Sequence, residues 1–250
     1  KVLQFETTSR GKNLVVFDID NTLIASRSEL GSDQWFEWQS QLIANNDPQF
    51  RIVSTMPELV AFNTKIKTLV PTRLTQNDLP VIIQTLRQNK IPVILLTSRG
   101  PDLRDNTESI LKDNGIWMSD LTFNKGFVDR FIPTGSKVEA SFMNGIFMTA
   151  GMHKGEALKY ILKYSLKKYE HIVFADDLER HTNRVYETFA AQAIPDITTF
   201  RYGREDVNVE TFKNKDKSAL HNQFIAFKNI IDQIFATKNM QSGAFQRRRN

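Results

Sequence analysis

Cysteine is absent from the 250-residue sequence, and its absence excludes several kinds of site. Without a thiol the chain can form no disulfide, no thiolate zinc site and no cysteine nucleophile. The absence indicates no compartment, because a protein without disulfides survives in oxidising and reducing surroundings alike. The sequence also lacks internal repeats, low-complexity blocks and any apolar run near the roughly 20 residues of a membrane-spanning helix. We therefore expect no membrane span.

The composition is that of an ordinary globular protein, with 40% hydrophobic and 24% charged residues. Its length suits one α/β domain with insertions. The formal net charge of +5 favours anionic partners in general, and we expect a phosphorylated substrate rather than nucleic acid. The sequence begins at Lys1 without an apolar leader, and we expect a periplasmic or secreted bacterial protein, with the cytoplasm as the alternative. No feature of the sequence indicates an oligomeric state.

Short apolar runs alternate with amphipathic stretches along the chain. Four runs rich in β-branched residues predict buried strands of a parallel sheet: Leu14–Phe17, Pro92–Leu96, Ile146–Thr149 and Ile172–Ala175. Apolar residues spaced three and four apart predict helices over Leu79–Asn89, Leu103–Asn114, Glu156–Lys168, Leu178–Ala193 and Ala219–Ala236. This alternation predicts a doubly wound α/β fold, in which ligands bind at the carboxyl ends of the strands.

Two stretches interrupt the alternation. Residues 28–73 contain two predicted helices, Asp33–Ala44 and Glu58–Leu69, without a clear buried strand, and we interpret them as a helical cap over the site. Residues 123–144 favour a β-hairpin or an irregular insertion. The predicted division is a core domain of residues 1–27 and 74–250 with a cap of residues 28–73.

The sharpest signal is FDIDNTL, Phe17 to Leu23, directly after the first predicted strand. Residues two apart on an extended chain point the same way, and a turn at the strand end would gather Asp18, Asp20 and Thr22 in one small site. Two neighbouring carboxylates repel each other unless a cation lies between them. Mg²⁺ is the cation expected there, because it takes oxygen ligands and accepts few from the protein.

The other three predicted strands also end in polar groups. These groups are, in chain order, Thr97, Ser98 and Arg99, then Lys154, then Asp176 and Asp177. A hydroxyl and an ammonium can donate to the non-bridging oxygens of a phosphate, and further acids can complete the shell of a metal. Taken singly, Thr97 would be an ordinary strand-end hydroxyl and Lys154 a surface lysine. Their order along the strand ends favours one joint site.

In this order the residues resemble the four motifs of the haloacid dehalogenase (HAD) superfamily, over about residues 14–185. The stretch LLTSRGPDLRDNTESILKDNGI, which begins at Leu95, is similar to the second-motif region of bacterial class B and class C acid phosphatases and their plant relatives. It is also similar to a group of HAD-like proteins of intracellular bacterial pathogens. The resemblance implies a HAD-like Rossmannoid core with a helical cap, and a magnesium-dependent hydrolase of phosphoric monoesters.

The resemblance also implies roles for single residues. Asp18 is expected to be the nucleophile that forms an aspartyl-phosphate, and Asp20 the general acid and then the general base. Mg²⁺ would bind Asp18, the backbone carbonyl of Asp20 and one acid of the fourth motif. Asp177 is favoured as that acid, with Asp176 as an outer-shell or lysine partner, and the reverse assignment stays open. The residues expected to bind the phosphoryl group are Thr97, Ser98, Arg99 and Lys154.

Three alternatives stay open beside this interpretation. A phosphotransferase would use the same site to pass the phosphoryl group to another alcohol. A catalytically silent HAD-like or receiver-like binding module would keep the acids without turnover, although a degenerate member should have lost a key residue and none is lost here. The third alternative concerns Arg99 alone, which would form a surface salt bridge instead of contacting the substrate.

Overall fold

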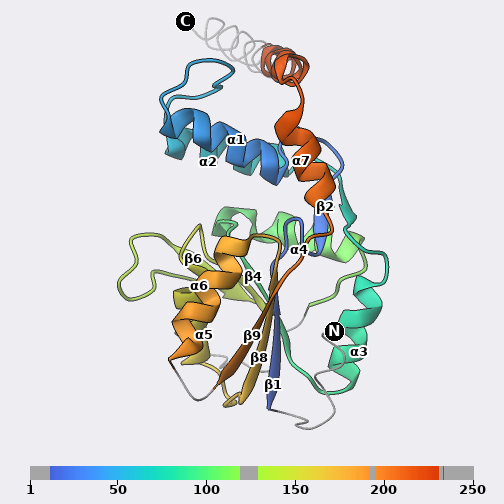
Figure 1. The fold of residues 1–250 in the computed structure, drawn as a ribbon, viewed down its shortest axis with the longest axis vertical. Helices are drawn as coiled ribbons and strands as arrows, with labels where there is room; N and C mark the ends of the chain where they lie inside the picture. Colours follow the sequence, from blue (N-terminus) through green and yellow to red (C-terminus); the bar gives the residue numbers. More distant parts are fainter. Residues whose placement is uncertain (1–11, 119–128, 192–194, 231–232, 234–250) are drawn as a thin grey trace, which may run out of the picture.

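The computed structural model of the chain describes residues 12–118, 129–191, 195–230 and 233. A seven-stranded sheet forms its centre (Figure 1). In spatial order its strands are β5 (Arg130–Phe131), β6 (Ala140–Met143), β7 (Ile146–Met148), β4 (Val93–Thr97), β1 (Asn13–Phe17), β8 (His171–Asp176) and β9 (Asp196–Arg201). The last five run parallel, and β5 and β6 complete one edge in antiparallel pairing.

Helices cover both faces of this sheet. They are α3 (Leu79–Gln88), α4 (Arg104–Asp113) after a short 3-10 turn η2 (Pro101–Leu103), α5 (Lys154–Leu162) and α6 (Glu179–Ala190). In β1, Val15 and Phe17 pack in one hydrophobic cluster with residues of α3 and α4. Leu14 and Val16 pack in a second cluster with residues of α5 and α6. Both faces of β1 are therefore buried, which explains the apolar run Leu14–Phe17. The predicted α/β fold with a mostly parallel sheet is confirmed.

The predicted elements agree with the structure at the centre of the sheet and differ at its edges. All four predicted strands and the helices between them are present. The helix predicted to extend to Lys168 ends at Leu162, and β9 is a strand that the sequence pattern does not predict. The hairpin expected within residues 123–144 is present as β5 and β6, and its residues 123–128 lie outside the described part of the chain. The predicted last helix is helical over 218–230.

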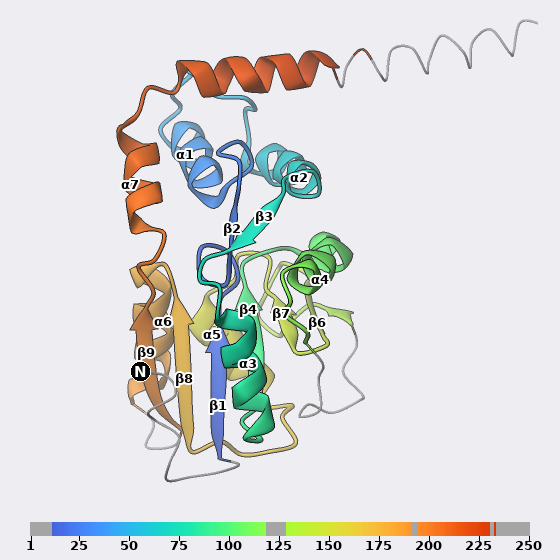
Figure 2. The same ribbon diagram turned by 90° about the vertical axis from the view of Figure 1, so that its right-hand side faces the viewer.

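Residues 28–73, here called the helical insertion, lie above the carboxyl ends of the central strands (Figure 2). A two-stranded antiparallel ribbon of β2 (Ile24–Ser26) and β3 (Thr72–Leu74) connects the insertion to the sheet. Its helices are α1 (Asp33–Ala44) and α2 (Met56–Lys67), close to the two predicted ranges. The insertion therefore lies over the edge of the sheet at which an α/β fold binds its ligands.

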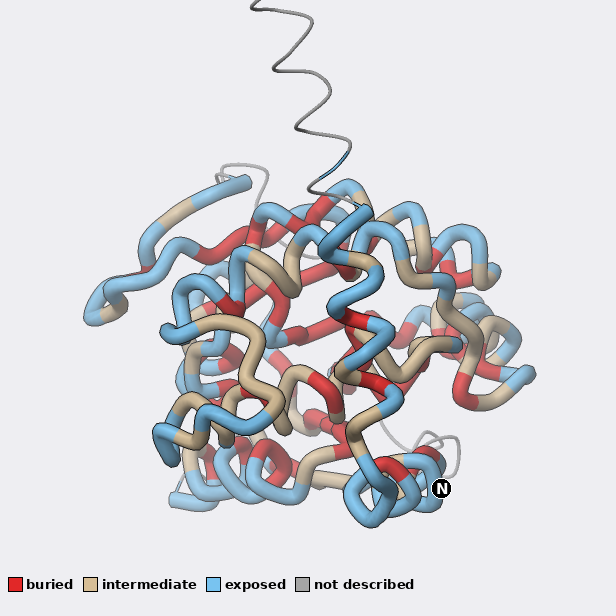
Figure 3. The backbone as a smooth tube through the Cα atoms, turned by 90° about the horizontal axis from the view of Figure 1, so that it is seen from above, coloured by how far each residue is buried: buried red, intermediate tan, exposed pale blue. Residues whose placement is uncertain are grey.

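The C-terminal part of the chain packs on the helical insertion. Trp35 and Leu59 form a third hydrophobic cluster with Phe212 of α7 (Asp206–Asn214) and with Leu220. Viewed from above, buried stretches gather toward the middle of the molecule, and exposed stretches lie mostly on its outer side (Figure 3). The insertion thus shares its core with residues that follow the whole sheet in the sequence.

Within the described ranges, no helix has both the length and the hydropathy needed to cross a membrane.

Candidate active site

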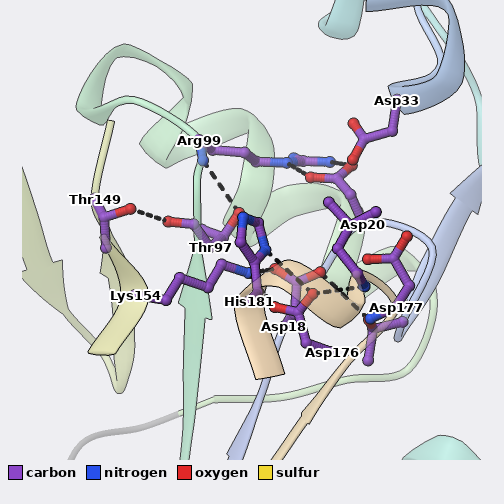
Figure 4. A network of polar contacts seen from close by, with 12 residues as sticks. Asp18, Asp20, Asp33, Thr97, Arg99, Thr149, Lys154, Asp176, Asp177 and His181 are labelled. Atoms are coloured by element: carbon purple, nitrogen blue, oxygen red, sulfur yellow. Dashed lines mark hydrogen bonds and ion pairs between the residues drawn. The ribbon is translucent and has the colours of Figure 1, made fainter. Parts of the chain in front are cut away.

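Asp18 follows β1 directly and is buried at the carboxyl edge of the sheet (Figure 4). The chain then turns sharply at Asn21, whose φ of 56° lies in the left-handed region that asparagine adopts more readily than most residues. The turn returns Thr22 to the site. Its hydroxyl donates to Asp18 Oδ2 at 3.3 Å and accepts the backbone N–H of Asp177 at 3.0 Å. Thr22 therefore lies beside Asp18, as the sequence predicts, and it also joins the ends of β1 and β8.

Lys154 follows β7 in the sequence, begins α5 and reaches the same place. Its Nζ lies 2.5 Å from Asp18 Oδ1 and 2.5 Å from Asp176 Oδ2, and only 1% of the side chain is exposed. Burial lowers the pKa of Lys154, but the two carboxylates outweigh burial and raise the pKa above its usual value. Lys154 is therefore a buried cation between two acids rather than a surface lysine.

Asp176 is held by several donors. Its Oδ1 accepts the backbone N–H of Leu178 at 2.9 Å and lies 3.2 Å from His181 Nδ1, while Oδ2 contacts Lys154. Burial raises the pKa of Asp176, but Lys154 and His181 outweigh it and lower the pKa to about 2. Asp176 is thus an ionised partner of the lysine, which is the position favoured for it from the sequence.

Asp177 has a different environment. None of the described residues donates a hydrogen bond to its carboxylate. Burial and the charges of Asp18 and Asp176 raise the pKa of Asp177 to about 9. Burial also raises the pKa of Asp18 to about 8, although Lys154 opposes this. The raised pKa values of these two neighbouring acids indicate that the described cations do not fully balance the negative charge at this point.

The carboxylates fit a divalent ion. Asp18, Asp176 and Asp177 each offer one oxygen, and these oxygens lie within 4.8 Å of one another. Oxygen donors are the ligands that Mg²⁺ prefers. An ion at this point would offset the repulsion that raises the pKa values of Asp18 and Asp177. Asp20, whose backbone carbonyl is the ligand expected from the resemblance, contributes no side-chain oxygen to this cluster.

Asp20 instead turns toward the helical insertion (Figure 4). Arg99 donates from Nε to Oδ2 and from Nη2 to Oδ1, both at 2.8 Å, and Lys67 donates to Oδ1 at 2.8 Å. Burial raises the pKa of Asp20, but these two cations outweigh it and hold the pKa well below its usual range. A proton donor must first carry a proton, so the predicted acid role requires Asp20 to loosen these contacts.

The three residues predicted at the end of β4 have separate environments. Thr97 is buried, and its hydroxyl accepts the backbone N–H of Arg99 at 3.2 Å. No described residue accepts the proton of the Thr97 hydroxyl, which is therefore left for another acceptor. Ser98 is exposed and has no hydrogen-bond partner among the described residues. Arg99 is buried, so its pair with Asp20 is not the surface salt bridge of the alternative interpretation.

Three contributors to the site are not among the residues predicted from the sequence: Lys67, Asp33 and His181. His181 lies in the first turn of α6, just beyond the end of β8, and that position was a usable signal. Lys67 has no comparable signal. Its partner Asp20 is 47 residues away, and a lysine in the last turn of a helix usually interacts with the helix dipole in solvent.

The charges of the whole network agree with one divalent ion. Its members are the carboxylates of Asp18, Asp20, Asp33, Asp176 and Asp177 and the cations Lys67, Arg99 and Lys154. Burial lowers the pKa of His181, which therefore adds no charge near neutral pH. With every acid ionised, five negative charges face three positive ones. The difference equals the charge of a single Mg²⁺.

The comparison with protein families gives one match. A family described as a protein of unknown function, DUF2608, matches residues 3–237. Comparison with curated proteins gives no significant match. The matched residues include the sheet, the helical insertion and every residue of the site. Because the match covers far more than half of the chain, the chain belongs to the DUF2608 family.

Proposed function

We propose that the chain is a magnesium-dependent phosphatase with a HAD-like core, in which the helical insertion serves as the cap. It would hydrolyse phosphate monoesters through an aspartyl-phosphate on Asp18. One observation supports this above all others. The carboxylate of Asp18 lies at the end of the central strand with an ammonium at 2.5 Å and two further acids beside it. This is an arrangement suited to a metal-assisted attack on phosphorus.

In the first step a carboxylate oxygen of Asp18 attacks phosphorus. A bond forms between this oxygen and phosphorus, and the bond from phosphorus to the alcohol oxygen breaks. Lys154 offsets the negative charge gathered at Asp18 and the phosphoryl group. The Thr97 hydroxyl can donate a hydrogen bond to a phosphoryl oxygen. Asp18, Asp176 and Asp177 would hold Mg²⁺, which would supply positive charge against the repulsion between carboxylates and phosphate.

Asp20 transfers the protons in both steps. It gives a proton to the leaving alcohol oxygen, and it then takes a proton from the water that attacks the aspartyl-phosphate. This second attack breaks the bond between phosphorus and the Asp18 oxygen, which releases inorganic phosphate and restores the carboxylate. Arg99 and Lys67 keep Asp20 ionised in this arrangement, and the base step needs one of its oxygens to be freed from these cations. The acid step needs Arg99 and Lys67 to release it.

The test is turnover of an aryl phosphate, with Mg²⁺ and with a chelator. We expect turnover with Mg²⁺ only, and Asp18→Asn should lower kcat at least about a thousandfold, as removal of a nucleophile does in other enzymes. A screen of nucleotides, sugar phosphates and phosphopeptides extends the test beyond one ester. Calorimetry of Mg²⁺ binding to the parent and to Asp177→Asn provides a readout that does not depend on turnover. Full activity in Asp18→Asn would exclude the assigned nucleophile.

A catalytically silent binding module is the second candidate, and one observation favours it. Both oxygens of Asp20 are engaged by cations, so the group that should protonate the leaving alcohol is occupied. Such a module would bind Mg²⁺ and phosphate esters without releasing phosphate from any ester in the screen. The third candidate, a phosphotransferase, would form a new ester when an acceptor alcohol is added.

A further inference from the structure

Lys67 is the last residue of α2, yet its side chain points inward to the site. Only 9% of the side chain is exposed. A lysine in the last turn of a helix can usually extend its ammonium into water, so an inward orientation requires acidic partners. Lys67 has two of them: its Nζ donates to Asp20 Oδ1 at 2.8 Å and to Asp33 Oδ1 at 2.8 Å. The ammonium is therefore placed to hold two carboxylates at once.

The two carboxylates on Lys67 are not held equally. Asp20 belongs to the core, is 17% exposed in its side chain and accepts two further hydrogen bonds from Arg99. Asp33 begins α1, and 36% of its side chain is exposed. Among the described residues, only Lys67 donates a hydrogen bond to the Asp33 carboxylate. Asp33 is therefore the partner that can leave Lys67 at the smaller cost.

A small cavity lies between these groups and the wall of the helical insertion. Asp20, Asp33, Lys67 and Arg99 line it, together with residues of β2 and the start of α1. Its volume is about 20 Å³, which holds roughly one water molecule. The alcohol part of a substrate attacked by Asp18 needs more room than this beside Asp20. An alcohol part that occupies this cavity would need a lining side chain to move, and Asp33 is the least restrained of the four.

We propose that Lys67 binds a carboxylate of the substrate in the place that the Asp33 carboxylate takes in this structure. The substrate class is then a phosphate monoester whose alcohol carries a carboxylate next to the ester, and this inference rests on the proposed phosphatase function. Exchange of one carboxylate for another leaves the charge of the network unchanged. It also keeps the buried ammonium paired, whereas a neutral alcohol would leave it with one partner fewer.

The test compares 2-phosphoglycerate with glycerol 2-phosphate, which differ only in a carboxylate against a hydroxymethyl group. We expect kcat/KM in the parent to favour 2-phosphoglycerate at least about tenfold, as a desolvated charge pair should, and the ratio to fall near one in Lys67→Met. Both esters are measured in the same variant, so a general effect on folding or on Asp20 cancels in the ratio. Lys67→Arg, which keeps the charge, should retain most of the preference.

Two further variants sharpen the comparison. Lys65→Met removes an exposed lysine from the same helix and should leave both rates and their ratio as in the parent. Asp33→Asn removes the competing carboxylate and should raise the ratio. If Lys67→Met retains the preference of the parent, or if the parent hydrolyses both esters with equal kcat/KM, the inference is wrong and the phosphatase proposal is unaffected.

A binding measurement separates this inference from catalysis. Calorimetry with Asp18→Asn and Mg²⁺ should show tighter binding of 2-phosphoglycerate than of glycerol 2-phosphate, and Asp18→Asn with Lys67→Met should bind the two alike. This result would stand even if the parent hydrolysed no ester of the screen, in which case the phosphatase proposal fails and the carboxylate site does not. Equal binding of both esters to Asp18→Asn would overturn the carboxylate site.

Discussion

Asp18 and Asp177 oppose each other's ionisation across a short distance. Burial and neighbouring charge raise their pKa values to about 8 and about 9, whereas a free aspartate has a pKa near 3.9. A carboxyl group with a raised folded-state pKa stabilises the fold at low pH, and this contribution is lost as pH rises from about 4 through the folded-state value. A bound divalent ion would offset this loss of stability at higher pH, because it binds the ionised forms of the two carboxyl groups.

Stabilisation by Mg²⁺ should therefore grow with pH. At pH 6 the ion must displace protons from Asp18 and Asp177, and near pH 9 most of these protons have already left. We expect the increase in Tm at a fixed Mg²⁺ concentration to be larger at pH 9 than at pH 6, as measured by scanning calorimetry. In Asp177→Asn the increase should be smaller and should depend less on pH. An increase in Tm that is larger at pH 6 would contradict the assignment of these two ligands.

The hydroxyl of Thr22 can be tested separately. Thr22→Val keeps the shape of the side chain but leaves the backbone N–H of Asp177 and one oxygen of Asp18 without this partner. We expect the free energy of unfolding to fall by about 1–3 kcal/mol, the usual cost of a buried polar group left unpaired. Urea denaturation measures the change, and Thr22→Ser, which retains the hydroxyl, should lose less. Equal stability of Thr22→Val and the parent would mean that the hydrogen bonds of this hydroxyl to Asp18 and Asp177 do not stabilise the fold.

At the level of helices and strands, the centre of the sheet is predictable from the sequence, whereas its edge strand β9 is not. β1, β4 and β8 are buried on both faces, so each appears as an apolar run. β9 lies at the edge, where its partly exposed residues DITTFR interrupt the apolar pattern. β2 and β3 have only three residues each, too few for a periodicity.

The same difference separates the predicted site residues from the unpredicted ones. Asp18, Thr97 and Asp176 lie at the ends of neighbouring parallel strands, and any right pairing of those strands brings them together. The contact of Lys67 with Asp20 depends instead on the path of the helical insertion over the sheet. No periodicity in the sequence specifies that path, so the sequence predicts Arg99 at the site but not Lys67, the second cation that contacts Asp20.

Gly155, the residue after Lys154, allows α5 to lie close to α6. A Cβ at this position would lie 2.1 Å from Thr188 Oγ1 and 2.6 Å from the backbone oxygen of Arg184. Gly155→Ala should therefore push the two helices apart and lower the free energy of unfolding by about 1–3 kcal/mol. Gly100→Ala is the matched control, since no atom lies within 4 Å of its added Cβ. Equal urea midpoints for the two variants would contradict the close approach.

At the scale of the whole molecule, segments far apart in the sequence complete one another. The core of the helical insertion contains Trp35 and Leu59 from the first third of the chain and Phe212 and Leu220 from the last. The rings of Trp38 and Phe212 meet edge to face with their centroids 6.1 Å apart. The helical insertion is therefore stabilised from outside its own sequence range.

Phe212→Ala should lower the free energy of unfolding by about 3–5 kcal/mol, the usual loss for a large aromatic side chain in a core. Tryptophan fluorescence during urea denaturation is suited to the measurement, because Trp38 contacts the ring that is removed. Val207→Ala on the same helix removes a side chain that is 77% exposed, and it should change stability by less than about 0.5 kcal/mol. Equal stability of the two variants would mean that α7 does not support the insertion.

The late position of Phe212 also has a consequence for the order of assembly on the ribosome. A nascent chain folds from its N-terminus as it emerges, so Trp35 and Leu59 leave the exit tunnel long before α7 does. Until then their apolar surface has no cover from α7 and is open to chaperones. A chain stalled before residue 206 would therefore carry Asp18 and the helical insertion without the aromatic side chain of Phe212 that completes the core of the insertion.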